Sequence, residues 1–304
     1  MSPGPRFRPR RPLGSTGFVA TRLGAGDLAD RAIPFETCVA TLRRALDAGL
    51  NVVDTAPSYE DGYSEEIVGA AVRDRRAQVF VTTKIDHFDR AVAPQLSASL
   101  GRLGLDRVDL AVFHSVSTLD AWRAISSARG PFAELEAERA AGRARFVGIS
   151  SHHPDVLDLA IRAGACDVVL FPIGPYVDER YELEILPLAR SRNVGTIAFK
   201  TFGAGKLLSD TLGYQRPLAD AAPGSQTQRA LPHLVPAECV HYTLTRDPDV
   251  ALLGLSDPAE QDQAFRAAEA FEAPLAAAEL ARIRSQAAEA VRGKGPIWWN
   301  PSGS

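Results

Sequence analysis

Short runs of apolar, often β-branched residues recur along the chain and alternate with segments of helical periodicity. In the first helical segment, Phe35, Val39 and Leu46 fall on one face, as in a helix packed against a core. The short runs are almost continuously apolar, which is typical of parallel strands buried on both faces. The expected strands lie at about 22–26, 51–53, 79–83, 109–113, 146–149, 168–171, 194–198 and 250–253.

The number and spacing of these units favour a closed barrel over an open doubly wound sheet. We therefore predict an α/β fold, a (β/α)8 TIM barrel with an N-terminal β-hairpin at about 6–19 and a C-terminal extra helix at about 275–291. No linker rich in Pro and Gly divides the chain, so residues 1–304 are expected to form a single barrel domain. Residues 1–12, rich in Pro, are expected to be a flexible arm, and residues 293–304 a C-terminal tail.

The composition is that of an ordinary globular protein, with 304 residues, 45% hydrophobic positions and a net charge of −3. This charge argues against a general attraction to nucleic acid or to an anionic membrane, and we expect neither partner. The three cysteines are far apart without metal-ligand spacing, which fits a reducing compartment and predicts no metal site. With no apolar run long enough for a membrane span and no secretory signal pattern, a cytoplasmic location is expected.

Lysine is rare in this chain: the 34 basic residues include only Lys84, Lys200, Lys206 and Lys294. A buried lysine changes its pKa readily, whereas an arginine stays charged. The retained lysines therefore mark positions where function could require an ammonium group. The alternative, a coding bias toward arginine, explains the same counts.

Polar residues follow three successive expected strands, at the carboxyl ends where active sites of such barrels form. Asp54 and Tyr59 follow the second strand, Lys84 ends the third and His114 ends the fourth. An ammonium favours a phenolate, a carboxylate orients the ammonium, and a histidine can hydrogen-bond a carbonyl oxygen. The set is suited to protonating an oxygen while a hydride reaches its carbon. Taken singly, each residue also has an ordinary structural interpretation, as a helix cap, a solvated lysine or a core histidine.

Several motifs in register resemble the aldo-keto reductase superfamily, and its bacterial branch in particular. They are DTAPSYEDGYSEEIVG at 54–69, VFVTTK at 79–84, VDLAVFH at 108–114 and GRARFVGISSHHP at 142–154. The similarity extends from LGSTG at 13–17 to GLSDPAEQ at 254–261, which is nearly the whole chain. It implies a barrel that binds NADPH across its strand ends, with Tyr59 as the general acid, Lys84 and Asp54 tuning it, and His114 orienting the carbonyl.

The resemblance also implies cofactor contacts on the later strands. Ser150 and Ser151 would face the carboxamide, the ring of Phe199 would stack on the nicotinamide, and Ser256 would lie near the adenosine phosphate. Gly203, Gly205 and Lys206 would lie near the pyrophosphate, where small residues permit close approach and a cation offsets charge. The complete expected cofactor set is Gly26, Asp54, Ser150, Ser151, Phe171, Phe199, Lys200, Gly203, Gly205, Lys206, Gly254, Ser256 and Gln261.

Three positions depart from the family pattern. Ser150-Ser151 stands for the usual Ser-Asn, Phe171 aligns with a Gln, and Gln261 occupies a position where many members have an Arg. Without that Arg the chain lacks a guanidinium that could pair with the 2′-phosphate of NADPH, so NADH is an alternative cofactor.

The resulting hypothesis is an NAD(P)H-dependent oxidoreductase acting reversibly on a small aldehyde or ketone. Two alternatives remain at this point: a Schiff-base aldolase or isomerase using Lys84 or Lys200, and a non-catalytic nucleotide-sensing subunit. Trp298 and Trp299 are expected either to cap the barrel or to line the substrate pocket, with the structural role favoured.

Overall fold

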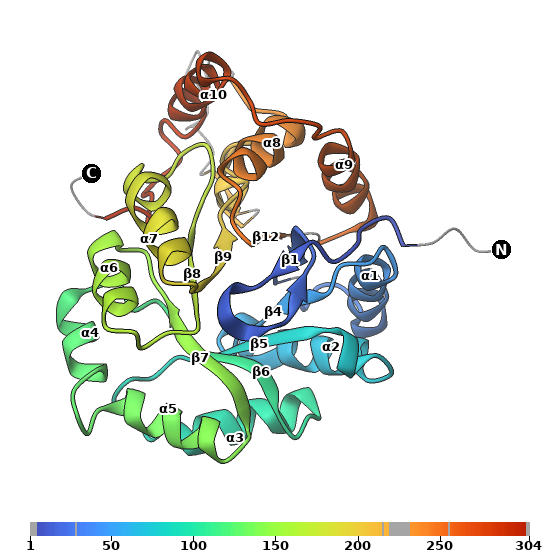
Figure 1. Cartoon of the computed structure of the whole chain (residues 1–304). Coiled ribbons are helices and arrows are strands. Elements are labelled where there is room, and N and C mark those ends of the chain that lie inside the picture. Colours follow the sequence, from blue (N-terminus) through green and yellow to red (C-terminus); the bar gives the residue numbers. More distant parts are fainter. Residues whose placement is uncertain (1–4, 28, 215, 219–231, 255, 302–304) are drawn as a thin grey trace.

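Eight parallel strands form a closed barrel in the computed structural model, which confirms the predicted fold class (Figure 1). The strands neighbour one another in chain order, and the last closes the barrel by pairing with both the first and the seventh. The described residues are 5–27, 29–214, 216–218, 232–254 and 256–301. The barrel strands are β3 (Leu23–Ala25), β4 (Val52–Asp54), β5 (Phe80–Ile85), β6 (Val108–Phe113), β7 (Ala144–Ser150), β8 (Val168–Pro172), β9 (Gly195–Phe199) and β12 (Val250–Leu253).

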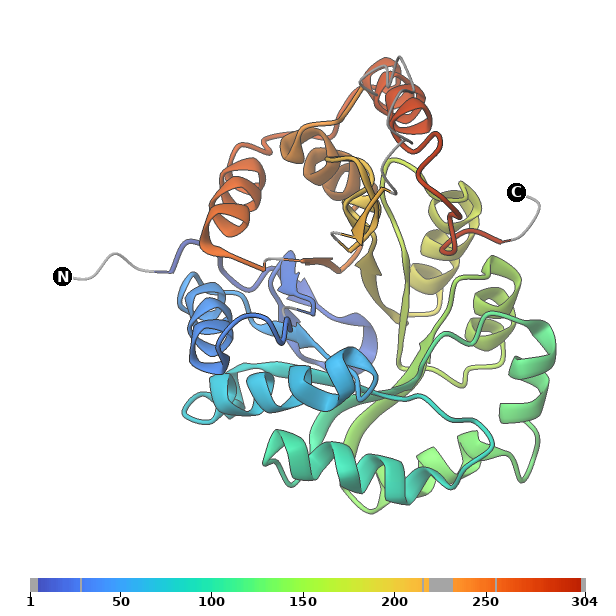
Figure 2. The ribbon, with the colours of Figure 1, turned by 180° about the vertical axis from the view of Figure 1, so that it is seen from behind.

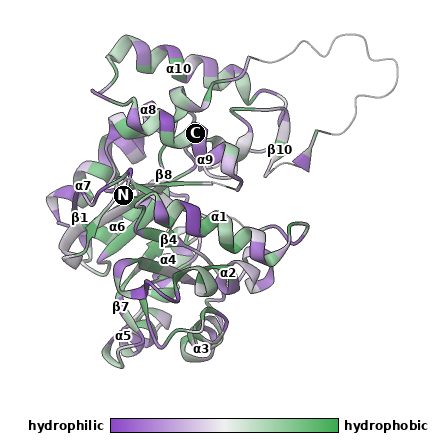
Figure 3. Ribbon diagram, turned by 90° about the vertical axis from the view of Figure 1, so that its right-hand side faces the viewer, coloured by the Kyte–Doolittle hydropathy of each residue, from purple (hydrophilic) through white to green (hydrophobic). Residues whose placement is uncertain are grey.

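Helices surround the barrel on the outside, as both ribbon views show (Figures 1 and 2). Each presents apolar positions to the strands and polar positions to solvent, the distribution visible in the hydropathy colouring (Figure 3). The extra C-terminal helix, α10, confirms the expectation for about 275–291. The helices are α1 (Phe35–Asp47), α2 (Tyr63–Val72), α3 (Val92–Leu103), α4 (Leu119–Ile125), α5 (Pro131–Ala140), α6 (Pro154–Arg162), α7 (Leu186–Ser191), α8 (Pro236–Arg246), α9 (Pro258–Glu269) and α10 (Ala277–Ala290).

The predicted N-terminal hairpin is present and consists of β1 (Arg11–Pro12) and β2 (Val19–Ala20). It covers the amino end of the barrel. Leu13, which follows β1, is completely buried among the side chains inside the barrel. Gly14 has a φ of 51°, and a Cβ there would lie 2.2 Å from the backbone nitrogen of Gly195 at the start of β9. Only glycine permits this approach, so the barrel is closed at the end opposite the expected site.

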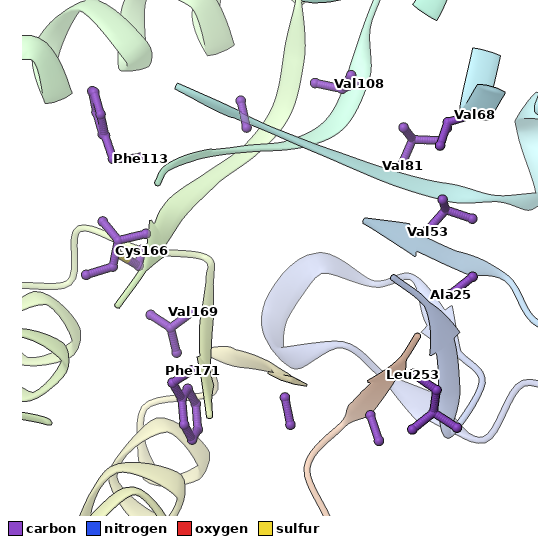
Figure 4. Close-up of a cluster of buried hydrophobic side chains, with 14 of the residues drawn as sticks. Ala25, Val53, Val68, Val81, Val108, Phe113, Cys166, Val169, Phe171 and Leu253 are labelled. Atoms are coloured by element: carbon purple, nitrogen blue, oxygen red, sulfur yellow. The ribbon is translucent and has the colours of Figure 1, made fainter. Parts of the chain in front are cut away.

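Side chains along each strand alternate between the barrel interior and the helix layer. Val52 and Phe80 belong to the interior cluster, whereas Val53 and Val81 belong to the cluster beneath the helices. Figure 4 shows this outer cluster around the strands. The alternation decides which residues at the carboxyl ends of the strands reach the interior.

The described part of the expected flexible arm lies against the barrel. The ring of Phe7 packs edge-on against Phe265, with centroids 5.1 Å apart, and the guanidinium of Arg6 donates two hydrogen bonds to the carboxylate of Glu269. The proline content of the arm excludes a helix, as expected, but does not prevent these contacts with the barrel. Residues 1–4 lie outside the described residues.

The long segment between β9 and α8 includes a small hairpin, β10 (Thr211–Gly213) with β11 (Arg216–Pro217). Part of this segment lies outside the described residues. None of the helices in the described ranges is long and apolar enough to cross a membrane.

Candidate active site

The strand alternation carries the predicted catalytic side chains into the barrel mouth. Asp54 lies two residues after the inward Val52, and Lys84 lies four after the inward Phe80. His114 follows β6 two residues after the inward Val112. Strands β4, β5 and β6 are adjacent in the barrel, so the three side chains meet at one edge of the mouth.

The ammonium of Lys84 is the centre of a hydrogen-bonded cluster. It donates to Asp54 Oδ2 at 2.7 Å, to the carbonyl of Thr55 at 2.8 Å and to the hydroxyl of Tyr59 at 3.1 Å. Lys84 and Asp54 are almost completely buried. Because the three ammonium protons have three acceptors, the hydroxyl of Tyr59 receives a hydrogen bond and retains its own proton for another acceptor.

Burial sets the protonation states of this cluster. Burial raises the pKa of Tyr59, and the charge of Lys84 opposes this rise only in part. The expected lowering by the ammonium is therefore outweighed by desolvation. For Lys84, burial lowers the pKa, but the charge of Asp54 and the hydrogen bonds to Asp54 and Tyr59 outweigh this effect, and the net shift is upward. At neutral pH the cluster thus holds a protonated phenol beside a charged ammonium and a carboxylate.

His114 has a carboxylate partner that sequence reasoning missed. Its Nδ1 makes a short hydrogen bond to Oδ1 of Asp86, and the backbone N–H of Ser58 donates to Asp86 Oδ2 at 2.9 Å. The imidazole lies edge-on to the ring of Tyr59, with centroids 5.7 Å apart. Burial lowers the pKa of His114, the hydrogen bond to Asp86 opposes this, and the charge of Lys84 adds to the lowering. Asp86 follows Lys84 by two positions, the spacing at which strand side chains share a face.

Phe199, at the end of β9, is half-buried at the mouth with its ring on the inward side. The ring of His152, just after β7, lies edge-on to it at 5.3 Å between centroids. Burial lowers the pKa of His152 to about 3, so this imidazole is neutral. Its Nε2 is buried and has no hydrogen-bond partner in the described part of the chain. A buried polar atom of this kind indicates a site for a ligand or water.

The sequence profile of the Aldo/keto reductase family matches residues 22–287 of this chain. The chain belongs to that family. An NADH-specific methylglyoxal reductase of Escherichia coli (strain K12) is 28% identical over 230 residues, covering 66% of this chain and 69% of the relative. A D-threo-aldose 1-dehydrogenase of Pseudomonas sp is 29% identical over 211 residues, covering 58% of this chain and 63% of the relative, just under two thirds of its length.

Solved structures agree on the fold of this aldo/keto reductase. An aldo-keto reductase from Bacillus halodurans in its holo form superposes with a TM-score of 0.70 at 22% identity, covering 92% of this chain and 96% of that one. At that identity the match supports the architecture of the barrel. The family and the oxidoreductase names of its relatives support an enzyme that acts on carbonyl groups.

Several expected cofactor positions of the reductase do lie at the carboxyl ends of the strands. The hydroxyl of Ser150 accepts the backbone N–H of Ser115 at 2.8 Å, and that of Ser151 accepts the N–H of His153 at 3.0 Å. Ser150 therefore braces the loop after β6, and Ser151 braces the loop after β7. Gly203 and Gly205 adopt positive φ values of 54° and 87° in the turn after β9, a conformation that favours glycine.

On the far side of the mouth, Gly26 donates its N–H to the carbonyl of Leu253 at 2.9 Å, which holds the end of β3 against β12. Gly254 is exposed, and a Cβ there would meet no atom within 4 Å. Ser256 is half-buried, and its N–H donates to Glu260 Oε2 at 2.9 Å. These residues line an open edge beside the start of α9.

Three of the expected cofactor residues are placed elsewhere. Phe171 faces outward, into the outer cluster (Figure 4), because the inward residue of β8 is Leu170. Its ring stacks on that of Tyr181, with centroids 6.0 Å apart. Gln261 is buried between helices, where its Nε2 donates to the carbonyl of Thr41 at 2.7 Å. The structure does not bring these two side chains to the barrel mouth, since the packing of the barrel wall holds both.

Lys206 is the third correction. Its side chain has no exposed surface, and its ammonium donates to the carbonyls of Lys294 at 2.7 Å and Pro296 at 2.8 Å. Lys294 reciprocates with a hydrogen bond of 2.9 Å to the carbonyl of Lys206. This lysine pair joins the loop after β9 to the C-terminal tail, so Lys206 is not available to a phosphate.

The tail itself has a structural and a peripheral tryptophan. Trp299 is completely buried and donates its indole N–H to the carbonyl of Tyr176 at 2.8 Å, which confirms the favoured structural role. Trp298 lies at the rim with its ring 5.8 Å from that of Tyr214. The ammonium of Lys200 contacts the Tyr214 hydroxyl and lies 4.9 Å from the centre of its ring. Among the described residues no group of three or more His, Cys, Asp or Glu is placed to hold a metal ion.

Proposed function

We propose that this aldo/keto reductase interconverts a small aldehyde or ketone and its alcohol with a nicotinamide dinucleotide, and that Tyr59 is the general acid. One observation carries the proposal: the Lys84 ammonium bonds Asp54, the Thr55 carbonyl and the Tyr59 hydroxyl at the barrel mouth. Such a cluster has no structural necessity in a barrel wall, where the neighbouring inward positions are apolar.

The chemistry follows from the protonation states. When bound, the reduced nicotinamide supplies a hydride to the carbonyl carbon. Tyr59 gives its proton to the carbonyl oxygen, and the resulting phenolate is stabilised by the ammonium of Lys84 at 3.1 Å. Asp54 keeps that ammonium oriented and charged, and solvent returns the proton to Tyr59. In the direction of alcohol oxidation the same groups act in reverse.

The dinucleotide has suitable surroundings at the mouth. The inward ring of Phe199 offers a stacking face, and the unpartnered Nε2 of His152 beside it offers a hydrogen-bonding atom. Gly203 and Gly205 leave the turn after β9 without side chains. These features fit a planar, amide-bearing ring followed by a pyrophosphate.

Two carboxylates lie at the expected adenosine end, and the cation beside them, Arg44, is paired with Asp262 at 2.6 Å. Asp257 caps α9 by accepting the N–H groups of Ala259 and Glu260, and the Glu260 carboxylate accepts the N–H of Ser256. Carboxylates disfavour a 2′-phosphate and suit a free ribose hydroxyl. We therefore infer a preference for NADH over NADPH, in line with the name of the Escherichia coli relative.

The three acceptors around Lys84 also argue for the acid mechanism over Schiff-base chemistry. A lysine nucleophile must lose its proton, whereas Asp54 and Tyr59 hold this ammonium in its charged form and raise its pKa.

The test replaces Tyr59 by Phe and follows NADH consumption with a panel of small aldehydes and ketones. Tyr59→Phe is expected to lower turnover by at least ~100-fold while NADH still binds, since only the proton donor is lost. Tyr63→Phe is the matched control, because the Tyr63 hydroxyl bonds the Ile33 carbonyl and lies outside the cluster. Full turnover by Tyr59→Phe would refute the assignment.

A further inference from the structure

Asp86 connects three catalytic loops. It lies just after β5, two residues beyond Lys84. Its Oδ2 accepts the backbone N–H of Ser58, the residue before Tyr59, and its Oδ1 bonds Nδ1 of His114 after β6. The carboxylate therefore contacts the loops that carry the acid and the imidazole at once.

These contacts fix which nitrogen of His114 carries hydrogen. The pKa of Asp86 is held below its usual value, because its hydrogen bonds with His114 and Ser58 outweigh the effect of burial, so it is an acceptor only. Oδ1 then requires a hydrogen on Nδ1. In a neutral imidazole the hydrogen on Nδ1 leaves Nε2 as an acceptor. Within the described ranges Nε2 has no protein partner, and ring geometry turns it away from Asp86.

We propose that Asp86 is a positioning residue that holds His114 with hydrogen on Nδ1, so that Nε2 accepts the hydroxyl hydrogen of an alcohol in the binding complex. The proton then passes to the Tyr59 phenolate only in the chemical step. The inference rests on the proposed function and adds the substrate form that the resting site recognises. A carbonyl oxygen has no hydrogen to offer Nε2. It is accommodated by the imidazolium, which donates from both nitrogens.

The surroundings keep His114 neutral near pH 7. The charged or titratable groups that face it are Asp86, Lys84, Asp54, Tyr59 and His152. Burial and the charge of Lys84 lower its pKa, whereas Asp86 raises it, and the net direction is downward. Alcohol is therefore the better ligand above this pKa.

The decisive variant is Asp86→Asn. The backbone N–H of Ser58 can only donate, so it will bond the amide oxygen of Asn, and the amide NH2 group will face Nδ1 of His114. The imidazole must then move its hydrogen to Nε2. The KM for the alcohol should rise about five- to tenfold at pH 8, which corresponds to the loss of one hydrogen bond, while the KM for the carbonyl substrate should fall.

Histidine 15N NMR reads the tautomer without any substrate. We expect the wild-type resonances, assigned by their loss in His114→Gln, to show hydrogen on Nδ1, and Asp86→Asn to show it on Nε2. Asp89→Asn is the matched control, since Asp89 is exposed on the same loop. Hydrogen on Nε2 in the wild type would overturn the proposal. A tautomer that differs between the wild type and Asp86→Asn, with no opposite change in the KM values for alcohol and carbonyl, would overturn it as well. A failure of Tyr59→Phe to lower turnover would refute the proposed function instead, and would leave the tautomer result unaffected.

Discussion

The lysine pair behind the C-terminal tail gives a sharp prediction about stability. Replacing Lys206 by Met removes the two hydrogen bonds that its ammonium donates to the carbonyls of Lys294 and Pro296. A hydrogen bond from a charged donor contributes about 1.5–3 kcal/mol, so the gross loss is about 3–6 kcal/mol. Methionine keeps the contact with the Trp298 ring and avoids burying an ammonium, which offsets part of the loss. We expect a net loss of about 2–4 kcal/mol in the free energy of unfolding.

Urea unfolding followed by tryptophan fluorescence measures this change. Two of the three tryptophans, Trp298 and Trp299, lie in the tail that the pair anchors, so their emission should shift to longer wavelength. Lys200→Met is the control, because the Lys200 ammonium is only half-buried and bonds the exposed Tyr214; its expected loss is below about 1 kcal/mol. A loss within about 0.5 kcal/mol for Lys206→Met, with unchanged emission, would mean that the pair does not anchor the tail.

Other predictions concern the wall and the mouth of the barrel. Arg102→Met leaves the completely buried Glu65 without the cation now 2.6 Å away, and it should lower the free energy of unfolding by about 3–5 kcal/mol. A double variant that also carries Glu65→Gln should regain most of this loss. Urea unfolding of the wild type and the two variants tests both expectations. Alcohol oxidation should decline as pH falls through the lowered pKa of His114, because the added proton occupies the acceptor Nε2. Since Asp86 raises this pKa, the midpoint of the pH profile of kcat/KM should move to still lower pH in Asp86→Asn. An unchanged midpoint would contradict this prediction. Glu260→Gln should increase the affinity for NADPH more than the affinity for NADH, because it removes a negative charge near the 2′ position. Equal changes in the two dissociation constants, measured by calorimetric titration, would mean that the adenosine binds elsewhere.

Much of the barrel was predictable because its strands are short apolar runs that must be buried on both faces. The convergence of Asp54, Lys84 and His114 followed from their positions at the ends of adjacent strands. The assignment of Phe171 failed at a finer level: an alignment gives a position on a strand, but the side of the strand depends on alternation from Leu170. Counting inward and outward positions from the apolar residues would have detected this.

Other features depended on contacts between distant segments. The bond between Lys206 and the carbonyl of Lys294 spans 88 residues, and no local pattern announces it. The rarity of lysine was nonetheless informative, since Lys84, Lys206 and Lys294 are all fully or almost fully buried and hydrogen-bonded. Asp86 was missed because its partners, Ser58 and His114, come from two other loops.

The central claim is that this barrel transfers a hydride between a nicotinamide and a carbon atom while Tyr59 manages the proton. The most direct measurement uses NADH carrying deuterium at the transferable position, in each of its two stereochemical forms, with an aldehyde or ketone that the enzyme reduces. The account predicts one deuterium on the carbinol carbon of the product from one of the two forms, and none on its oxygen after exchange with water. Product without carbon-bound deuterium from either form would contradict the account.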